Sequence, residues 1–322
     1  MNWSGTSSRR RFAAFAWGLL AYNIPVILWG AYVRISFSGD GCGANWPFCN
    51  GQVIPQHMKA PMAIEFAHRL MTGVDSLAAI LLCLWAFRAF SRGQAVRRFA
   101  TFFLFFLFVE AILGAGLVLF RYVAHDASAG RAVYLAAHLT NTLLLLGALA
   151  ATAWSAEAKR GNFSWDKISA PFAGALAVSL LIGITGAIAA LGDTLFPAAS
   201  LAAGMREDLS SASSLLLRLR MFHPLIAILG STYLLWLAVR LVRDIRETVH
   251  RAGVRVLFLI LLQIAAGVVN LALLAPVWMQ LVHLALADLL WIAVVLMTMD
   301  AGSVTNSRAV RETLDLVPGL TE

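Results

Sequence analysis

Four of the seven histidines lie inside long apolar segments of the chain, where an ionisable side chain is costly and usually functional. They are His68, His138, His223 and His283. An imidazole can carry a proton or bind a metal at neutral pH. Two imidazoles that face each other across a helix bundle are a common pair of axial ligands for a haem iron. The natural pairing joins His68 with His138 and His223 with His283, and it predicts two haem sites.

Other interpretations of these histidines are weaker. Zinc is disfavoured because neither pair has the cysteine or acidic ligands that usually complete a tetrahedral site. Any one of the four could be an ordinary hydrogen-bonded core residue, but all four lie at one depth, six to nine residues from the end of a segment. The remaining histidines, His57, His125 and His250, fall in predicted loops and are interpreted as ordinary polar residues.

A carboxylate distinguishes the first histidine from the others. In the stretch AIEFAHRL, Glu65 stands three residues before His68 on the same helical face, and Arg69 follows directly. The related stretch LRMFHPLI has Arg220 in place of the glutamate. A carboxylate one turn from a haem ligand could transfer protons at the haem edge. The alternative is a Glu65–Arg69 pair with structural value only.

Several arginines stand close to the predicted haem sites. A guanidinium group can bind a haem propionate through two hydrogen bonds, and a long side chain that only reaches toward the interface is the alternative. The candidates are Arg34, Arg69, Arg218 and Arg220.

The segments that must position these residues belong to a membrane protein. Of 322 residues, 60% are hydrophobic and 13% are charged, and about 20 apolar residues cross a bilayer as a helix. The sequence therefore predicts an all-α polytopic membrane protein with eight transmembrane helices. We place them at 12–35, 62–88, 98–120, 132–154, 168–190, 215–239, 254–274 and 277–299.

The net charge of +8 indicates topology rather than nucleic-acid binding. If both termini are cytoplasmic, 17 of the 25 Lys and Arg residues fall in cytoplasmic segments, as the positive-inside rule requires. The loop SGDGCGANWPFCNG then faces outward. The apolar segment after Arg9–Arg11 is longer than a signal peptide core, and no A-x-A-like site follows it, so we expect a retained first helix.

Short motifs recur in the same order in the two halves of the chain. EAILGAG in the third segment matches QIAAGVV in the seventh, and AAHLTNTLLLL in the fourth matches LVHLALADLLW in the eighth. The order predicts two parallel-repeat four-helix bundles, residues 1–158 and 159–322, linked through residues 154–167.

Taken together, these residues resemble the haem A synthase family over nearly the whole chain. The features that carry the resemblance are VRISFSGDGCGANWPFCNG, IEFAHR and the later paired histidines. The resemblance implies an enzyme that oxidises a methyl group of haem O to the formyl group of haem A, by successive hydroxylations with oxygen from water. It implies that His68 and His138 bind haem O beside Glu65, the catalytic carboxylate, and that His223 and His283 ligate a haem b cofactor.

The resemblance also implies partners, a location and a cysteine pair. Haem O would come from a haem O synthase, and the electron donor or acceptor is unknown. The location would be the cell (inner) membrane, and a homo-oligomer is compatible with the sequence. Cys42 and Cys49 match the cysteine pair of the family and are expected to form a disulfide, as a staple over the first site or as a redox-active pair. Residues 191–214 lack the second cysteine pair of some members.

Two other functions are compatible with parts of the sequence. A di-haem b-type electron carrier accounts for the four histidines but gives no reason for Glu65. A parallel-repeat transporter could use the histidines as proton relays, and Pro25 and Gly30 are mild indications of a broken helix. A carrier should keep its haem spectrum and redox function after Glu65→Gln, and the absence of bound haem would favour the transporter.

Overall fold

The computed structural model describes residues 6–157, 163, 168–210 and 214–303. These residues form ten helices. They are α1 (Thr6–Ile35), α2 (Ala60–Ala89), α3 (Ala95–Leu119), α4 (Ala129–Ala156), α5 (Ala170–Leu195), α6 (Leu201–Leu209), α7 (Leu215–Arg220), α8 (Phe222–Val242), α9 (Glu247–Ala272) and α10 (Val277–Ala301). The described residues form isolated bridges but no strand.

The predicted eight membrane-spanning helices are confirmed in the described part of the chain by length and composition, with α7 and α8 counted as one span, Leu215–Val242. Most helices begin several residues earlier than predicted. Pro61 and Pro171 lie in first turns, where the missing N–H costs nothing. His250 was wrongly assigned to a loop: it lies in the first turn of α9.

The sixth span is interrupted at Met221, between α7 and α8. The cause is Pro224, because it has no N–H to donate to the carbonyl of Arg220. The sequence shows this proline directly after His223, but the interruption was not predicted. The short helix α6, which precedes α7, was not predicted either.

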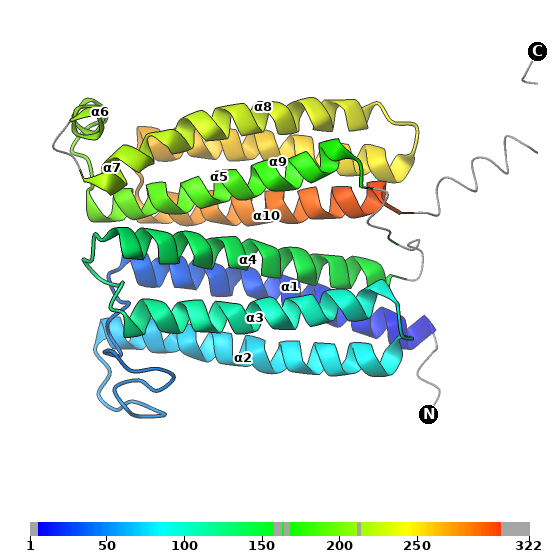
Figure 1. The fold of residues 1–322 in the computed structure, drawn as a ribbon, viewed down its shortest axis with the longest axis horizontal. Helices are drawn as coiled ribbons and strands as arrows, with labels where there is room; N and C mark the ends of the chain where they lie inside the picture. The colour runs from blue at the N-terminus through cyan, green and yellow to red at the C-terminus, as the bar shows by residue number, and fades with distance from the viewer. Residues whose placement is uncertain (1–5, 158–162, 164–167, 211–213, 304–322) are drawn as a thin grey trace, which may run out of the picture.

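The spans group into two bundles, one of α1 to α4 and one of α5, α8, α9 and α10, as Figure 1 shows. Helix α1 begins and helix α10 ends at the same end of the molecule. The connection 36–59 and helix α6 lie at the opposite end, which we call the loop end. The proposed link 154–167 and the boundary at 158 and 159 lie largely outside the described residues.

The two bundles meet along α1, α4, α5 and α10. One hydrophobic cluster continues from the first bundle onto α10, where Trp291 and Val295 pack near Gly147 of α4. The indole N–H of Trp291 donates to the carbonyl of Leu143 at 2.5 Å. The small residue at Gly147 lets these helices approach closely, as is common between helices in membranes. This contact helps to fix the two bundles relative to each other.

Replacement of Leu146 by alanine should destabilise the protein, because this side chain is fully buried in the cluster that joins the bundles. A buried Leu→Ala change typically costs about 2–5 kcal/mol. Leu77→Ala is the matched control, because Leu77 is 65% exposed on the surface of the first bundle. Thermal unfolding in detergent should show a lower midpoint for the first variant only. Equal midpoints would contradict the packing role of Leu146.

Candidate functional site

The connection after α1 forms a compact loop closed by a disulfide between Cys42 and Cys49. The predicted bond is thus present, and both cysteines are buried. Backbone bonds within the loop run between Cys49 and Gln52 and from Asn50 to the carbonyl of Cys42. The peptide bond between Trp46 and Pro47 is cis.

This loop holds the carboxylate of Glu65. The backbone N–H of Cys42 donates to Oε2 of Glu65 at 2.8 Å. Arg69 donates to Oε1 of Glu65 at 2.5 Å and also to the carbonyls of Asn45 and Phe48. Glu65 is only 3% exposed. The disulfide loop, Arg69 and Glu65 therefore form one connected unit at the start of α2.

Gly41 makes this contact sterically feasible. A Cβ at this position would stand 2.5 Å from the backbone of Pro61 and 2.6 Å from the nitrogen of Met62. Contacts this short with rigid backbone do not occur, so a side chain here would push the loop off the first turn of α2. The glycine places the N–H of Cys42 within reach of Glu65.

Each of the four helix histidines packs against a glycine on the preceding span. His68 faces Gly30 of α1, and a Cβ there would stand 2.9 Å from its Cε1 atom. His223 faces Gly186 of α5 and His283 faces Gly267 of α9. A Cβ on either glycine would stand 3.2 Å from Cε1 of the ring that it faces. His138 faces Gly114 of α3, where a Cβ would stand 4.0 Å from its Cε1 atom. The same pairing in all four positions supports the predicted repeat at the level of the site.

The histidines also pair within each half. His68 and His138 lie close enough for a charge on one ring to act on the other, and the same holds for His223 and His283. Each histidine lies in the second or third turn of its span, counted from the loop end of the molecule. The structure thus brings together the two pairs that the sequence predicts and places both near the loop end.

The ring nitrogens have few partners from the protein itself. The Nδ1 atoms of His68, His138 and His283 are buried and make no hydrogen bond to the described residues. Nδ1 of His138 lies 3.1 Å from Oε1 of Glu110, without the alignment of an ordinary hydrogen bond. Unsatisfied imidazoles, paired across each half, fit a haem held at both axial positions. Groups of three or more His, Cys, Asp or Glu side chains suited to a metal ion do not occur among the described residues.

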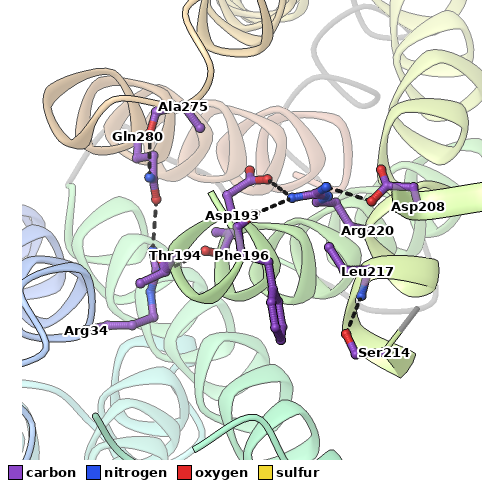
Figure 2. A network of polar contacts seen from close by, with 11 residues as sticks. Arg34, Asp193, Thr194, Phe196, Asp208, Ser214, Leu217, Arg220, Ala275 and Gln280 are labelled. Carbon is purple, nitrogen blue, oxygen red and sulfur yellow. Dashed lines mark hydrogen bonds and ion pairs between the residues drawn. The ribbon is translucent and has the colours of Figure 1, made fainter. Parts of the chain in front are cut away.

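The predicted propionate ligands lie in different surroundings. Arg34 at the end of α1 reaches into the second bundle, where it donates to the carbonyl of Ala190 at 2.6 Å, to the hydroxyl of Thr194 and to Gln280 (Figure 2). Arg34 therefore ties the bundles together at the loop end. Arg69, as described, bonds to Glu65 and the disulfide loop.

Arg220 stands at the centre of a second polar cluster, also drawn in Figure 2. Its guanidinium contacts Asp208 of α6 at 2.6 Å and Asp193 of α5 at 3.1 Å, and it donates to the carbonyl of Phe196. These contacts attach α6 and the end of α5 to α7. Arg218 lies two residues earlier in α7. Propionate binding by these four arginines stays a prediction.

Sequence reasoning missed several buried polar residues. Asn141 and Thr142 follow His138 by three and four residues and both donate to Glu110; this helical spacing could have identified them. Arg131 is 2% exposed and donates to the carbonyls of Ala124 and Asp126. Asp288 is fully buried, and neither of its oxygens has a hydrogen-bond partner among the described residues.

The fold defines a multi-pass membrane protein, and a pair of histidines lies within each of its two bundles. The sequence matches the COX15-CtaA family, described as cytochrome oxidase assembly protein, over residues 13–295. The chain belongs to this family, which confirms the resemblance noted in the sequence.

Individual relatives differ in name and in coverage. A Thermus thermophilus protein named protoheme IX farnesyltransferase is 43% identical over 303 residues, which cover 92% of this chain and 49% of the relative. Proteins named heme A synthase are 42% identical over 94 residues in Lysinibacillus sphaericus, 29% of this chain and 31% of the relative, and 36% identical over 112 residues in Exiguobacterium sibiricum, 35% and 38%. The matches thus span about half or less of each relative.

Replacement of Gly30 by alanine should displace the ring of His68, because the added Cβ would stand 2.9 Å from Cε1 and 3.1 Å from Nε2. We expect less haem bound at the first site, measured by Soret absorbance per protein. Gly73→Ala is the control, because a Cβ there has no neighbour within 4 Å. Alanine favours a helix over glycine by about 1 kcal/mol, so loss of folding is not expected in either variant. Unchanged haem content in Gly30→Ala would contradict the close packing.

Proposed function

We propose that the protein is a haem A synthase, which oxidises a methyl group of haem O to the formyl group of haem A for terminal oxidase assembly. The observation that carries the proposal is an asymmetry. Both halves contain a histidine pair, but the first half adds a carboxylate, Glu65, held beneath the disulfide loop. Membership of a cytochrome oxidase assembly family and relatives named heme A synthase support it.

In this proposal the first half binds the substrate. His68 and His138 hold haem O, and Glu65 lies one helical turn from His68. Conversion of the methyl to the formyl group with one net water releases four electrons and four protons. Glu65 accepts a proton at a carboxylate oxygen, and the N–H of Cys42 and the guanidinium of Arg69 keep that carboxylate oriented.

The second half binds the cofactor. His223 and His283 would ligate haem b, which when bound supplies one-electron transfer between the substrate site and an external partner. The hydroxyl of Thr185 lies 3.1 Å from Nδ1 of His223 and orients its ring. Pro224 ends α7 next to this ligand, so His223 stands at the start of a new helix. The identity of the electron acceptor is outside the proposal.

The surroundings of the enzyme follow from the same proposal. A relative named protoheme IX farnesyltransferase is about twice as long as the region it shares with this chain, which supports a functional link to the enzyme that makes haem O. We place the protein in the cell (inner) membrane with both termini in the cytoplasm. The loop end then faces an oxidising compartment, where the bond between Cys42 and Cys49 persists.

The geometry favours the staple role for this disulfide. Cys42 and Cys49 are buried, and the Cys42 N–H is bonded to Glu65. A structural link of this kind explains the cysteine pair without a redox step. A di-haem carrier would need the same histidines but not the contacts around Glu65, and a transporter would need no haem.

Replacement of Glu65 by glutamine should stop haem A formation while both haems stay bound. Glutamine keeps the shape of the side chain and an acceptor for Cys42 or Arg69 but cannot take up a proton. We expect the rate to fall by about a hundredfold or more. Pigments extracted from membranes with a haem O supply would be separated by chromatography.

The control is Glu247→Gln at the start of α9, where the glutamate side chain is 67% exposed and pairs with Arg251. It should leave haem A formation unchanged. Normal haem A yield from Glu65→Gln would refute the catalytic role of Glu65. Absence of haem A from the unaltered protein, with both haems bound, would favour a carrier.

Replacement of His283 by alanine should remove haem from the second site and leave the first site occupied. The two pairs lie in separate bundles, so loss of one ligand should not disturb the other pair. Haem content and the absorbance spectrum of the purified protein give the occupancy. His250→Ala is the control, because its Nδ1 atom lies 2.6 Å from the carbonyl of Val242, near the other end of the spans. Loss of both haems from His283→Ala would contradict two independent sites.

A further inference from the structure

Glu110 of α3 is a partly buried acidic residue to which the proposed reaction assigns no role. Its Oε1 atom lies 3.1 Å from Nδ1 of His138. Nδ2 of Asn141 donates to Oε2 at 2.6 Å, and the hydroxyl of Thr142 donates to Oε1. Asn141 also donates to the carbonyl of Phe106 on α3, so both helices fix the position of this carboxylate.

The repeat-related residue in the second half is a neutral amide. Gln263 of α9 aligns with Glu110, but its Nε2 atom lies 3.4 Å from Nε2 of His283, whereas Glu110 lies beside Nδ1 of His138. His223 has the hydroxyl of Thr185 as its partner. Nδ1 of His68 has none among the described residues. Of the four rings, His138 is therefore the one that meets a carboxylate in the described part of the chain.

A carboxylate next to a ligating imidazole has a known physical effect. The ring nitrogen that carries hydrogen donates to the carboxylate, which fixes the tautomer and leaves the other nitrogen free for the metal. The negative charge makes the free nitrogen more basic, so that it donates electron density to the metal more strongly. It therefore stabilises the oxidised, more positive iron over the reduced iron. A neutral amide orients a ring without this charge.

We propose that Glu110 is a positioning residue of the first-half site: its carboxylate, 3.1 Å from Nδ1 of His138, attracts that edge of the ring and leaves Nε2 for the iron, and its charge lowers the reduction potential of the haem bound there. Gln263 is neutral, so it does not lower the reduction potential of the haem in the second half. An electron is then more readily passed from the first half to the second. The inference rests on the proposed function, because it requires haem at both histidine pairs.

The test exchanges the two partners. Glu110→Gln gives the first half the amide of the second, and Gln263→Glu gives the second half the carboxylate of the first. Redox titration of the purified full chain, followed by absorbance, yields a midpoint potential for each haem. The His283→Ala variant, which retains only the first-half haem, assigns the two midpoints. Glu110→Asp tests rescue by a shorter carboxylate.

We expect Glu110→Gln to shift the oxidation equilibrium of the first-half haem about tenfold toward the reduced form, ~59 mV for one electron, with the other haem unchanged. Gln263→Glu should shift the second-half haem in the opposite direction, and Glu110→Asp should restore part of the first shift. If Glu110→Gln does not fold, the Gln263→Glu result decides alone.

A purely structural role for Glu110 would lower thermal stability and haem content without moving either midpoint, and that result would overturn the inference. If the unaltered protein makes haem A and binds both haems but neither exchange shifts a potential, the inference fails and the proposed function stands. If the unaltered protein binds no haem, both fail.

Discussion

A polar side chain inside a bilayer has no water to bond with, so its partners must come from the protein or from a bound group. This constraint explains most buried polar residues in the structure. Asp75 accepts from Asn23 at 3.0 Å, and Arg34 donates across the bundle interface to Ala190 and Thr194. The same constraint distinguishes buried polar side chains that have a hydrogen-bond partner in the protein from those that have none and could bind a ligand.

Three of the unsatisfied groups belong to the histidine pairs. The Nδ1 atoms of His68, His138 and His283 are buried without a hydrogen bond to the described residues, although the chain offers hydroxyls and amides elsewhere. A glycine on the preceding span stands opposite each ring, so that no side chain occupies that place. Nδ1 of the fourth ring, His223, lies 3.1 Å from the hydroxyl of Thr185. That arrangement suits a ligand better than a core.

The sequence predicts the features that depend on composition and periodicity. The eight spans follow from apolar length, and the four histidines follow from their positions in those spans. The spacing of Glu65 and Arg69 allows their pair to be expected. The contact of Glu65 with Cys42 could not be predicted, because it depends on the path of residues 36–59, which the apolar pattern does not specify. Arg34 was expected at the first site, but its contacts cross to α5, since helix packing between halves is not visible in either half alone. The resemblance to a known family supplied the cysteine pairing.

Glu110 illustrates how a comparison of the two halves can identify a functional group. Glu65 and Arg220 also differ in charge between the halves, but each is balanced locally, by Arg69 in one case and by Asp193 and Asp208 in the other. The other partners of Glu110, Asn141 and Thr142, are neutral. Its charge therefore acts on the imidazole of His138 and is felt by His68 as well. Among the described residues, Glu110 is the carboxylate without a local positive partner that lies beside a ring of either histidine pair. Two related bundles could therefore hold two haems with different tendencies to give up an electron.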